Sequence, residues 1–299
     1  MKLVETALTT PEAKPPAGGQ ADHGLREKAM QSLSKLPPFS PILNKLVASL
    51  SDEDVSFSQL SDLIEKDTVL AGNVLRLVNS ALYGRNGTVN SVRRAVSLIG
   101  LAKLRNVAMS VSLTRLWNSS GASGWSPAPF NEHAVAAAIL ADLLAAELPV
   151  EYPEGAFTAG LLENLGMMLI ALGLPEQRSK IQQSYSVGTA PLADCEREVL
   201  GFDHAALSSD VLRQWNLPKP IQEAVGQHES PGPAPGAMGL GHLLYQVDLI
   251  AAQLGIVAQP WLRPADGSPQ ETLESLGVSG SVLESFKIEY ETIRGMFHS

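Results

Sequence analysis

The sequence predicts an all-α protein built from two helical lobes, and three observations support this prediction. Apolar residues recur with helical spacing along most of the chain. No Asn-Gly or Asp-Gly pair lies between alternating apolar runs, so strand and hairpin signals are nearly absent. A polar stretch rich in glycine, serine and proline, residues 118–129, interrupts the helical periodicity. We therefore expect helices on both sides of a connector at 118–129.

The first part of the chain is expected to form a disordered tail followed by a helical lobe. Residues 1–24 are assigned to the tail, because 9–24 are rich in proline, glycine, threonine and alanine without an apolar period. Residues 25–117 form the predicted N-terminal lobe. There, Leu60 and Ile64 share one helical face, and Asp67 is the expected N-cap of the next apolar helix. Further helices are expected at 41–50, 91–99 and 101–117.

Residues 130–255 form the predicted second lobe, and residues 256–299 form a C-terminal extension. Helix-stop glycines and helix-start prolines agree with the apolar periodicity. In the extension, Val282, Phe286 and Ile293 lie on one side of a predicted terminal helix. This helix could pack back on the bundle or mediate self-association. The helices of this half are expected at 130–147, 154–171, 176–186, 190–200, 204–214, 218–228, 238–254 and 279–293.

Charge is unevenly distributed over the 299 residues. The net charge is −9, yet the segment 25–117 carries five more basic than acidic residues, and 118–299 carries thirteen more acidic than basic ones. This asymmetry favours two surfaces with different partners, and the acidic half argues against nucleic-acid binding by the whole chain. A single cysteine excludes an internal disulfide and fits a reducing compartment. The N-terminus lacks a signal peptide, and the longest apolar stretch, 134–146, is too short for a membrane span, so we expect a cytoplasmic protein.

The basic half contains an ordered set of motifs: Leu36-Pro37-Pro38, Asn79-Ser80-Ala81 with Tyr83-Gly84, Ser91-Val92 and Leu98-Ile99-Gly100-Leu101. Together these motifs resemble the HDOD family, the bacterial HD-related output domain. The similarity extends to about residue 255. It implies an all-α fold in which a helical N-terminal lobe precedes a degenerate bundle related to the HD phosphohydrolases. It also implies a signalling role without demonstrated catalysis.

The resemblance also locates a degenerate HD site. HD phosphohydrolases carry a histidine on one helix, a His-Asp pair on the next and a later aspartate, which together hold divalent ions. His133 matches the first histidine, Asp248 matches the last aspartate, and Glu163-Asn164 replaces the pair. A neutral amide is a poor substitute for a carboxylate that bridges two cations. We therefore expect no efficient hydrolase, no metal and no cofactor.

Structural roles account for the polar residues of this site. His133 shares a helical face with apolar residues and is expected to be a neutral core histidine. His204 follows a predicted cap, and His228 ends a helix, where a donor meets free carbonyls. Glu163 and Asn164 are expected to make mutual and backbone hydrogen bonds across the bundle. Asp248 lies in an apolar helix, so it needs a partner if it is buried.

The basic half carries a second set of candidate residues, which could form a partner surface. Polar residues at the end of an apolar helix can fasten the loop that follows. Basic residues beyond that loop could make a stripe suited to an acidic protein surface or to phosphates, although a solvated face explains them equally well. The candidates are Asn79, Tyr83, Arg93, Arg94, Lys103 and Arg105.

The leading hypothesis is therefore a non-catalytic bacterial signalling protein that binds other regulatory proteins, with a link to cyclic-dinucleotide or two-component signalling. One alternative is a divergent metal-dependent phosphohydrolase that uses His133, Glu163 and Asp248 together with His204 and His228. Another is a small-ligand sensor that binds a nucleotide in the degenerate pocket.

Overall fold

The computed structural model describes residues 21–37, 40–49, 57–80, 88–118, 124–232 and 238–295. Within these ranges the chain is helical, and its single extended feature is one isolated bridge between Val150 and Met238. The predicted all-α class, a helical N-terminal lobe followed by a degenerate HD-like bundle, is confirmed. Most of the predicted tail and the centre of the connector lie outside the described residues.

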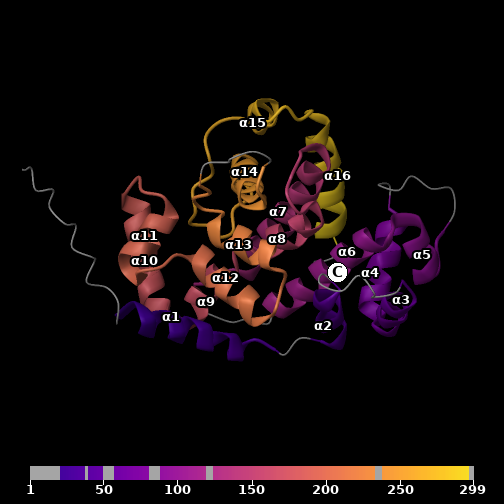
Figure 1. Ribbon diagram of the computed structural model, residues 1–299, viewed down its shortest axis with the longest axis horizontal. Coiled ribbons are helices and arrows are strands. Elements are labelled where there is room, and N and C mark those ends of the chain that lie inside the picture. Colours follow the sequence, from indigo (N-terminus) through magenta and orange to yellow (C-terminus); the bar gives the residue numbers. More distant parts are fainter. Residues whose placement is uncertain are drawn as a thin grey trace, which may run out of the picture.

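The N-terminal lobe packs its helices around α4 and α6 (Figure 1). Polar side chains begin its helices as the sequence requires. The side chain of Asp67 accepts hydrogen bonds from the backbone N–H groups of Val69 and Leu70, which confirms the predicted cap. Ser91 caps the next helix in the same way. The lobe consists of α2 (Pro41–Ala48), α3 (Phe57–Lys66), α4 (Thr68–Val78), α5 (Val92–Ile99) and α6 (Leu101–Asn118).

The second lobe is organised around a long central helix, α7, which packs against α6, α8, α14 and α16. Its alanine-rich face lets α8 approach closely. A Cβ atom on Gly160 of α8 would lie 2.7 Å from the carbonyl oxygen of Ala137, so no larger residue fits there. The lobe consists of α7 (Pro127–Glu147), η3 (Pro153–Gly155), α8 (Ala156–Leu162), α9 (Leu165–Gly173), α10 (Pro175–Val187), α11 (Leu192–Leu200), α12 (His204–Gln214), α13 (Lys219–Gln227) and α14 (Leu240–Gln253).

The continuous helix expected at 154–171 is broken in the structure, and this break positions the candidate site. Asn164 has φ −96° and ψ 12°, outside the α region, so α8 ends before it and α9 begins after it. The segment Pro153–Gly173 contains an 18-residue window with a mean hydropathy of 1.5 and could cross a membrane by length and composition, but this window is entirely buried inside the protein. It is therefore a core element of this fold.

The N-terminal helix α1 (Ala21–Gln31) differs from the expectation for the tail. Residues 21–24 are helical, and α1 with the short η1 (Ser32–Lys35) packs against α9 of the second lobe rather than within the first. Polar contacts hold it there, among them the pair of Arg26 with Asp210 at 2.6 Å and the hydrogen bond from Lys35 to the carbonyl of Leu172 at 2.8 Å. In Figure 1, α1 is the indigo helix that lies beneath the second lobe.

The C-terminal extension also packs back on the bundle. It contains α15 (Pro269–Ser275) and α16 (Ser281–Arg294), and α16 lies along α7. Phe286 and Ile293 of α16 are buried, so the apolar side of this helix is used within the chain. Lys103 of α6 contacts both Asp142 of α7 and Glu289 of α16, which ties the two lobes and the extension together.

Candidate functional site

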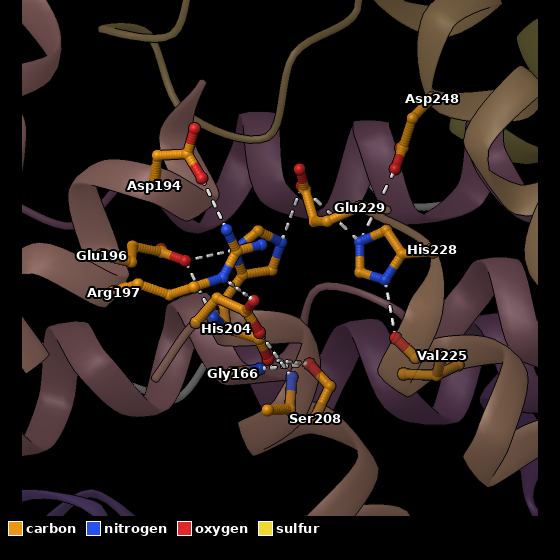
Figure 2. Close-up of polar contacts among 12 residues, drawn as sticks. Gly166, Asp194, Glu196, Arg197, His204, Ser208, Val225, His228, Glu229 and Asp248 are labelled. Atoms are coloured by element: carbon orange, nitrogen blue, oxygen red, sulfur yellow. Dashed lines mark hydrogen bonds and ion pairs between the residues drawn. The ribbon is translucent and has the colours of Figure 1, made fainter. Parts of the chain in front are cut away.

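The candidate site lies where the α8–α9 turn, the start of α12, the end of α13 and α14 meet beside α7. The structure brings together all six residues of the degenerate HD site, although they come from five separate segments. Figure 2 shows part of this network as alternating histidine rings and carboxylates. The six residues are His133, Glu163, Asn164, His204, His228 and Asp248.

His204 begins α12 and is fully buried between two glutamates. Asp203 caps the helix by accepting from the N–H of Ala206, as the sequence predicted. The ring Nδ1 of His204 lies 2.6 Å from a carboxylate oxygen of Glu196, and Nε2 lies 3.2 Å from Glu229. Burial alone would lower the pKa of His204, but the two carboxylates outweigh burial and raise this pKa well above its ordinary value.

His228 lies just after α13 and its tautomer is set by the backbone. Its Nδ1 is 2.7 Å from the carbonyl oxygen of Val225, which can only accept, so Nδ1 carries a proton. This contact fits the predicted role of a donor at a helix end. The opposite nitrogen, Nε2, faces two carboxylates, at 3.8 Å from Glu229 and 3.7 Å from Asp248.

His133 and Asp248 pair across the bundle. The Nε2 atom of His133 on α7 lies 3.3 Å from a carboxylate oxygen of Asp248 on α14. Asp248 thus has the partner that its position in an apolar helix requires, and it also reaches His228. His133 is buried, as expected for a core histidine, but its Nδ1 has no hydrogen-bond partner within the described residues.

Glu163 and Asn164 do not make the hydrogen bonds that we expected. Both side chains are buried, yet neither oxygen of Glu163 nor Oδ1 of Asn164 receives a hydrogen bond from any described residue. Because α8 ends and α9 begins at this pair, the two side chains lie in the candidate site and do not bond to each other across the bundle. Burial raises the pKa of Glu163 well above its ordinary value, and the facing carboxylates of Asp248 and Glu229 raise it further. Glu163 is therefore the carboxyl group in this cluster whose protonated form is favoured.

This proton gives a pH-dependent contribution to stability. The folded chain keeps it above pH 4.5, where an unfolded glutamate releases it, so the free energy of unfolding falls as pH rises toward the folded pKa. Glu163→Gln preserves a neutral side chain and removes the titration. The stability advantage of the variant over the wild type should grow by up to about 1.4 kcal/mol per pH unit between pH 5 and 7. Urea unfolding of metal-free protein measures this difference, and parallel pH profiles would contradict it.

The structure adds two site residues that the sequence analysis missed, Glu196 and Glu229. Burial alone would raise the pKa of Glu229, but His204 and His228 outweigh burial and lower this pKa to about 2. Adjacency to His228 was a signal for Glu229. Glu196 lies on a predicted helix, and nothing in the helical periodicity distinguishes it from a solvated acidic residue.

A cleft of about 210 Å³ opens onto this cluster. Its polar floor contains His133, Asn164, Glu229 and Asp248, and the rest of its lining is mainly apolar. At its rim the guanidinium of Arg263 lies 4.1 Å from the centre of the Tyr185 ring. The cleft therefore gives small solutes access to the carboxylates of an otherwise buried site.

The second candidate set does not form one basic stripe. Asn79 is a structural residue, because its side chain bonds both the N–H and the carbonyl of Val89 and thereby ties the end of α4 to the segment that precedes α5. Tyr83 lies outside the described residues. Lys103 points into the interface with α16, and half-buried Arg105 donates to the carbonyl of Ser49.

Burial also lowers the pKa of Arg105. The expectation that Lys103 and Arg105 belong to an exposed basic surface is therefore wrong: both are drawn inward by backbone and carboxylate acceptors. Arg93 and Arg94 on α5 remain exposed, and Arg93 pairs with Asp62 at 2.7 Å. Of the four basic candidates, Arg93 and Arg94 on α5 are the two that stay on the surface.

The comparisons with known proteins identify the family. The model of the HDOD domain matches residues 36–231, which is more than half of the chain. The chain belongs to the HDOD domain family. Among curated proteins it is 25% identical over 214 residues to an uncharacterised protein of Treponema pallidum. The match covers 68% of this chain but only 39% of that relative, so the chain spans about two fifths of the relative's length.

Solved structures share the HDOD fold at low sequence identity. An HDOD domain protein of Geobacter sulfurreducens has a TM-score of 0.71 and 20% identity, with 93% of this chain and 98% of that one covered. A candidate phosphohydrolase of Shewanella amazonensis has a TM-score of 0.68 and 23% identity, with 90% and 98% covered. A candidate signal transduction protein of Marinobacter aquaeolei has a TM-score of 0.66 and 20% identity, with 94% and 67% covered. At these identities the likeness concerns the fold alone.

The histidines and carboxylates gathered in this HDOD fold raise the question of divalent ions. The donor atoms of two groups, His204 with His228 and Glu229, and His133 with Glu163 and Asp248, lie within 4.8 Å of one another in each group. Their number and chemistry fit one cation in either place. They do not supply a carboxylate at Asn164 to bridge two cations, so the residues present do not fit the two-metal form of the site.

Proposed function

We propose that this HDOD protein is a signalling module that acts by binding regulatory proteins and does not hydrolyse phosphoesters. The proposal rests on the two residues that stand in place of the His-Asp pair, Glu163 and Asn164. Asn164 presents a neutral amide to the cleft, and beside it Glu163 is a fully buried carboxyl whose raised pKa keeps it protonated. Family membership supports the signalling role.

The physical reason for inactivity is a shortage of negative charge where two dications would have to meet. Two-metal hydrolysis needs ions about 3.5–4 Å apart, which repel each other unless a bridging anion lies between them. An amide offers one neutral oxygen. A protonated Glu163 adds no charge, and the carboxylates of Asp248 and Glu229 already lie against histidines of the chain.

A phosphoester assay tests this proposal directly. Purified full-length protein is incubated with Mn²⁺, Mg²⁺ or Zn²⁺ and with phosphomonoesters, phosphodiesters and cyclic dinucleotides, beside an active HD-type phosphodiesterase as positive control. We expect no turnover above that of the metal alone. Turnover that disappears in His133→Ala, with unchanged helical content by circular dichroism, would overturn the proposal.

The proposed partner surface is α5, whose exposed arginines suit an acidic protein. Arg93→Glu combined with Arg94→Glu reverses four units of charge and should abolish retention of such a partner in affinity capture from the source cells. The matched control is Lys180→Glu with Lys219→Glu, which reverses the same charge at exposed positions of the second lobe. A partner retained by the wild type and the control but lost from the α5 variant supports the surface. Equal loss from both variants would show only a general charge effect and would count against α5.

The phosphohydrolase alternative rests on the two histidine–carboxylate groups, and the turnover assay decides it. The nucleotide-sensor alternative is disfavoured by size. Pockets for small-molecule ligands usually measure about 300–1,000 Å³. The cleft above Asn164 measures about 210 Å³.

A further inference from the structure

We propose that a pocket between α1, α2 and the end of α12 binds a neutral, planar heteroaromatic molecule of about nucleoside size that carries no phosphate. The volume of this pocket is about 720 Å³, which lies within the range of roughly 300–1,000 Å³ usual for small-molecule sites. Its described lining contains no residue of the degenerate HD site and none of α5. The proposal therefore goes beyond the signalling function and does not depend on it.

The walls of the pocket come from three elements that lie far apart in the sequence. The end of α1, η1 and the residues just after η1 form one wall. Asn44 of α2 belongs to the N-terminal lobe, and Gln214 and Trp215 at the end of α12 belong to the second lobe. Figure 1 shows α1 and α2 along the same lower edge of the molecule. A molecule in the pocket therefore contacts both lobes at once.

Hydrogen bonds and backbone geometry behind the walls fix their positions. The buried hydroxyl of Ser32 lies 3.3 Å from the carbonyl oxygen of Leu169, which anchors η1 on α9. Ser40 caps the start of α2. Asn216 has φ 55°, a left-handed conformation that ends α12 at Trp215. Binding to walls that are already fixed costs little ordering of side chains and loops.

The charge of the lining determines the class of ligand. None of the described lining residues is charged. The cations next to them in sequence are engaged elsewhere, because Lys35 donates to the carbonyl of Leu172 and Arg213 pairs with Asp210 at 2.9 Å. A phosphate in this pocket would gain no charge-assisted hydrogen bond. We therefore infer a neutral ligand, which distinguishes this site from a nucleotide site.

The side chains of the lining favour a flat ring that carries both donors and acceptors. Trp215 is half-buried and supplies an indole face, on which a heteroaromatic ring can stack. The thioether of Met30 can pack against a bound ring. Gln31 and Gln214 are exposed, and each primary amide offers both a donor and an acceptor. An indole face bordered by amides suits a nucleobase or a similar heterocycle.

A pocket between two lobes could also be a solvent-filled junction with no ligand, and a binding screen separates the two cases. Full-length protein is screened by ligand-observed NMR against a library of neutral heteroaromatic fragments that includes adenosine and guanosine, with their 5′-monophosphates as charged counterparts. We expect saturable binding of neutral members, weaker binding of each monophosphate than of its nucleoside, and a higher unfolding temperature with the best binder. A library without one binder, or tighter binding of the monophosphates, would overturn the proposal.

Matched glutamine-to-alanine variants locate the bound molecule. Gln31→Ala combined with Gln214→Ala removes two exposed amides and leaves the core intact, so it should weaken the best binder by roughly tenfold or more through the loss of two hydrogen bonds. Gln183→Ala changes an exposed glutamine of α10 outside the pocket and should leave the affinity unchanged. Equal affinities of the double variant and the control would overturn the site.

Two further measurements identify the occupant and its contacts. In hydrogen exchange, the best binder should slow exchange in peptides from both α1 and α2, and protection confined to the cleft at Asn164 would contradict the proposal. Sedimentation of the protein without added ligand should show the same oligomeric state for the wild type and the double variant. A dimer that the double variant dissociates would mean that a second copy fills the pocket. None of these results bears on partner binding at α5.

Discussion

Lys103→Met is expected to destabilise the protein by about 3–5 kcal/mol, because it leaves a buried carboxylate without its cation. Lys103 on α6 lies between Asp142 of α7 and Glu289 of α16, and its side chain is 18% exposed. Burial raises the pKa of Glu289, and Lys103 opposes this effect. The substitution therefore removes the contact that joins the N-terminal lobe to the bundle and to the C-terminal helix.

Two further variants make this expectation specific. Lys103→Met combined with Glu289→Met should recover much of the lost stability, because Asp142 alone is about one-third exposed and can be hydrated. Lys287→Met removes a lysine from α16, the helix that carries Glu289. Lys287 forms an exposed pair with Glu284, so this substitution should cost less than about 1 kcal/mol. Urea unfolding measures all three. If the Lys103→Met variant were as stable as the Lys287→Met variant, the buried ion pair of Lys103 with Glu289 would not stabilise the fold as we expect.

Gly166→Ala should destabilise the protein by about 3 kcal/mol, at the upper end for overpacking, because the clash is with backbone. A Cβ atom on Gly166 of α9 would lie 2.1 Å from the carbonyl oxygen of His204 and 2.9 Å from its Cα. The N–H of Gly166 also donates to the hydroxyl of Ser208 at 2.8 Å. Separation of α9 from α12 would displace His204 from its two glutamates.

Thermal unfolding tests this contact with a glycine control in the same chain. For a protein of this size, a loss of about 3 kcal/mol lowers the Tm by roughly 6–12 °C. Gly72 lies inside α4 with open space around the added Cβ position, so Gly72→Ala should stabilise the protein by about 0.5–1 kcal/mol. Equal effects of the two substitutions would show that helix propensity dominates and that α9 and α12 are not tightly apposed.

Local features of the fold were predictable from the sequence, and features set by distant contacts were not. Helical periodicity and the caps Asp67 and Asp203 act within one or two turns, and the structure contains them as expected. The break at Asn164 could not be predicted, because the apolar residues before and after it follow one uninterrupted helical period. The position of α1 on the second lobe depends on contacts with residues more than 130 positions away, such as Leu172.

The candidate site shows the same division. Residue types and the family resemblance identified the six degenerate HD positions, and the structure gathers them. Glu196 could not be separated from other acidic residues, because its role arises from burial beside His204, and for Glu229 the one signal in the sequence was its adjacency to His228. Lys103 and Arg105 looked like surface cations in sequence, and only the position of α16 and of the Ser49 carbonyl shows why they turn inward.

Anomalous diffraction from crystals soaked in Mn²⁺ or Zn²⁺ tests the central claim most directly, because it counts and places ions independently of any choice of substrate. The claim is that Asn164 cannot serve as the anion between two catalytic cations. We expect no pair of ions between His133 and Asp248. Two peaks about 3.5–4 Å apart beside Asn164 would mean that a hydrolytic metal centre survives and would contradict the account.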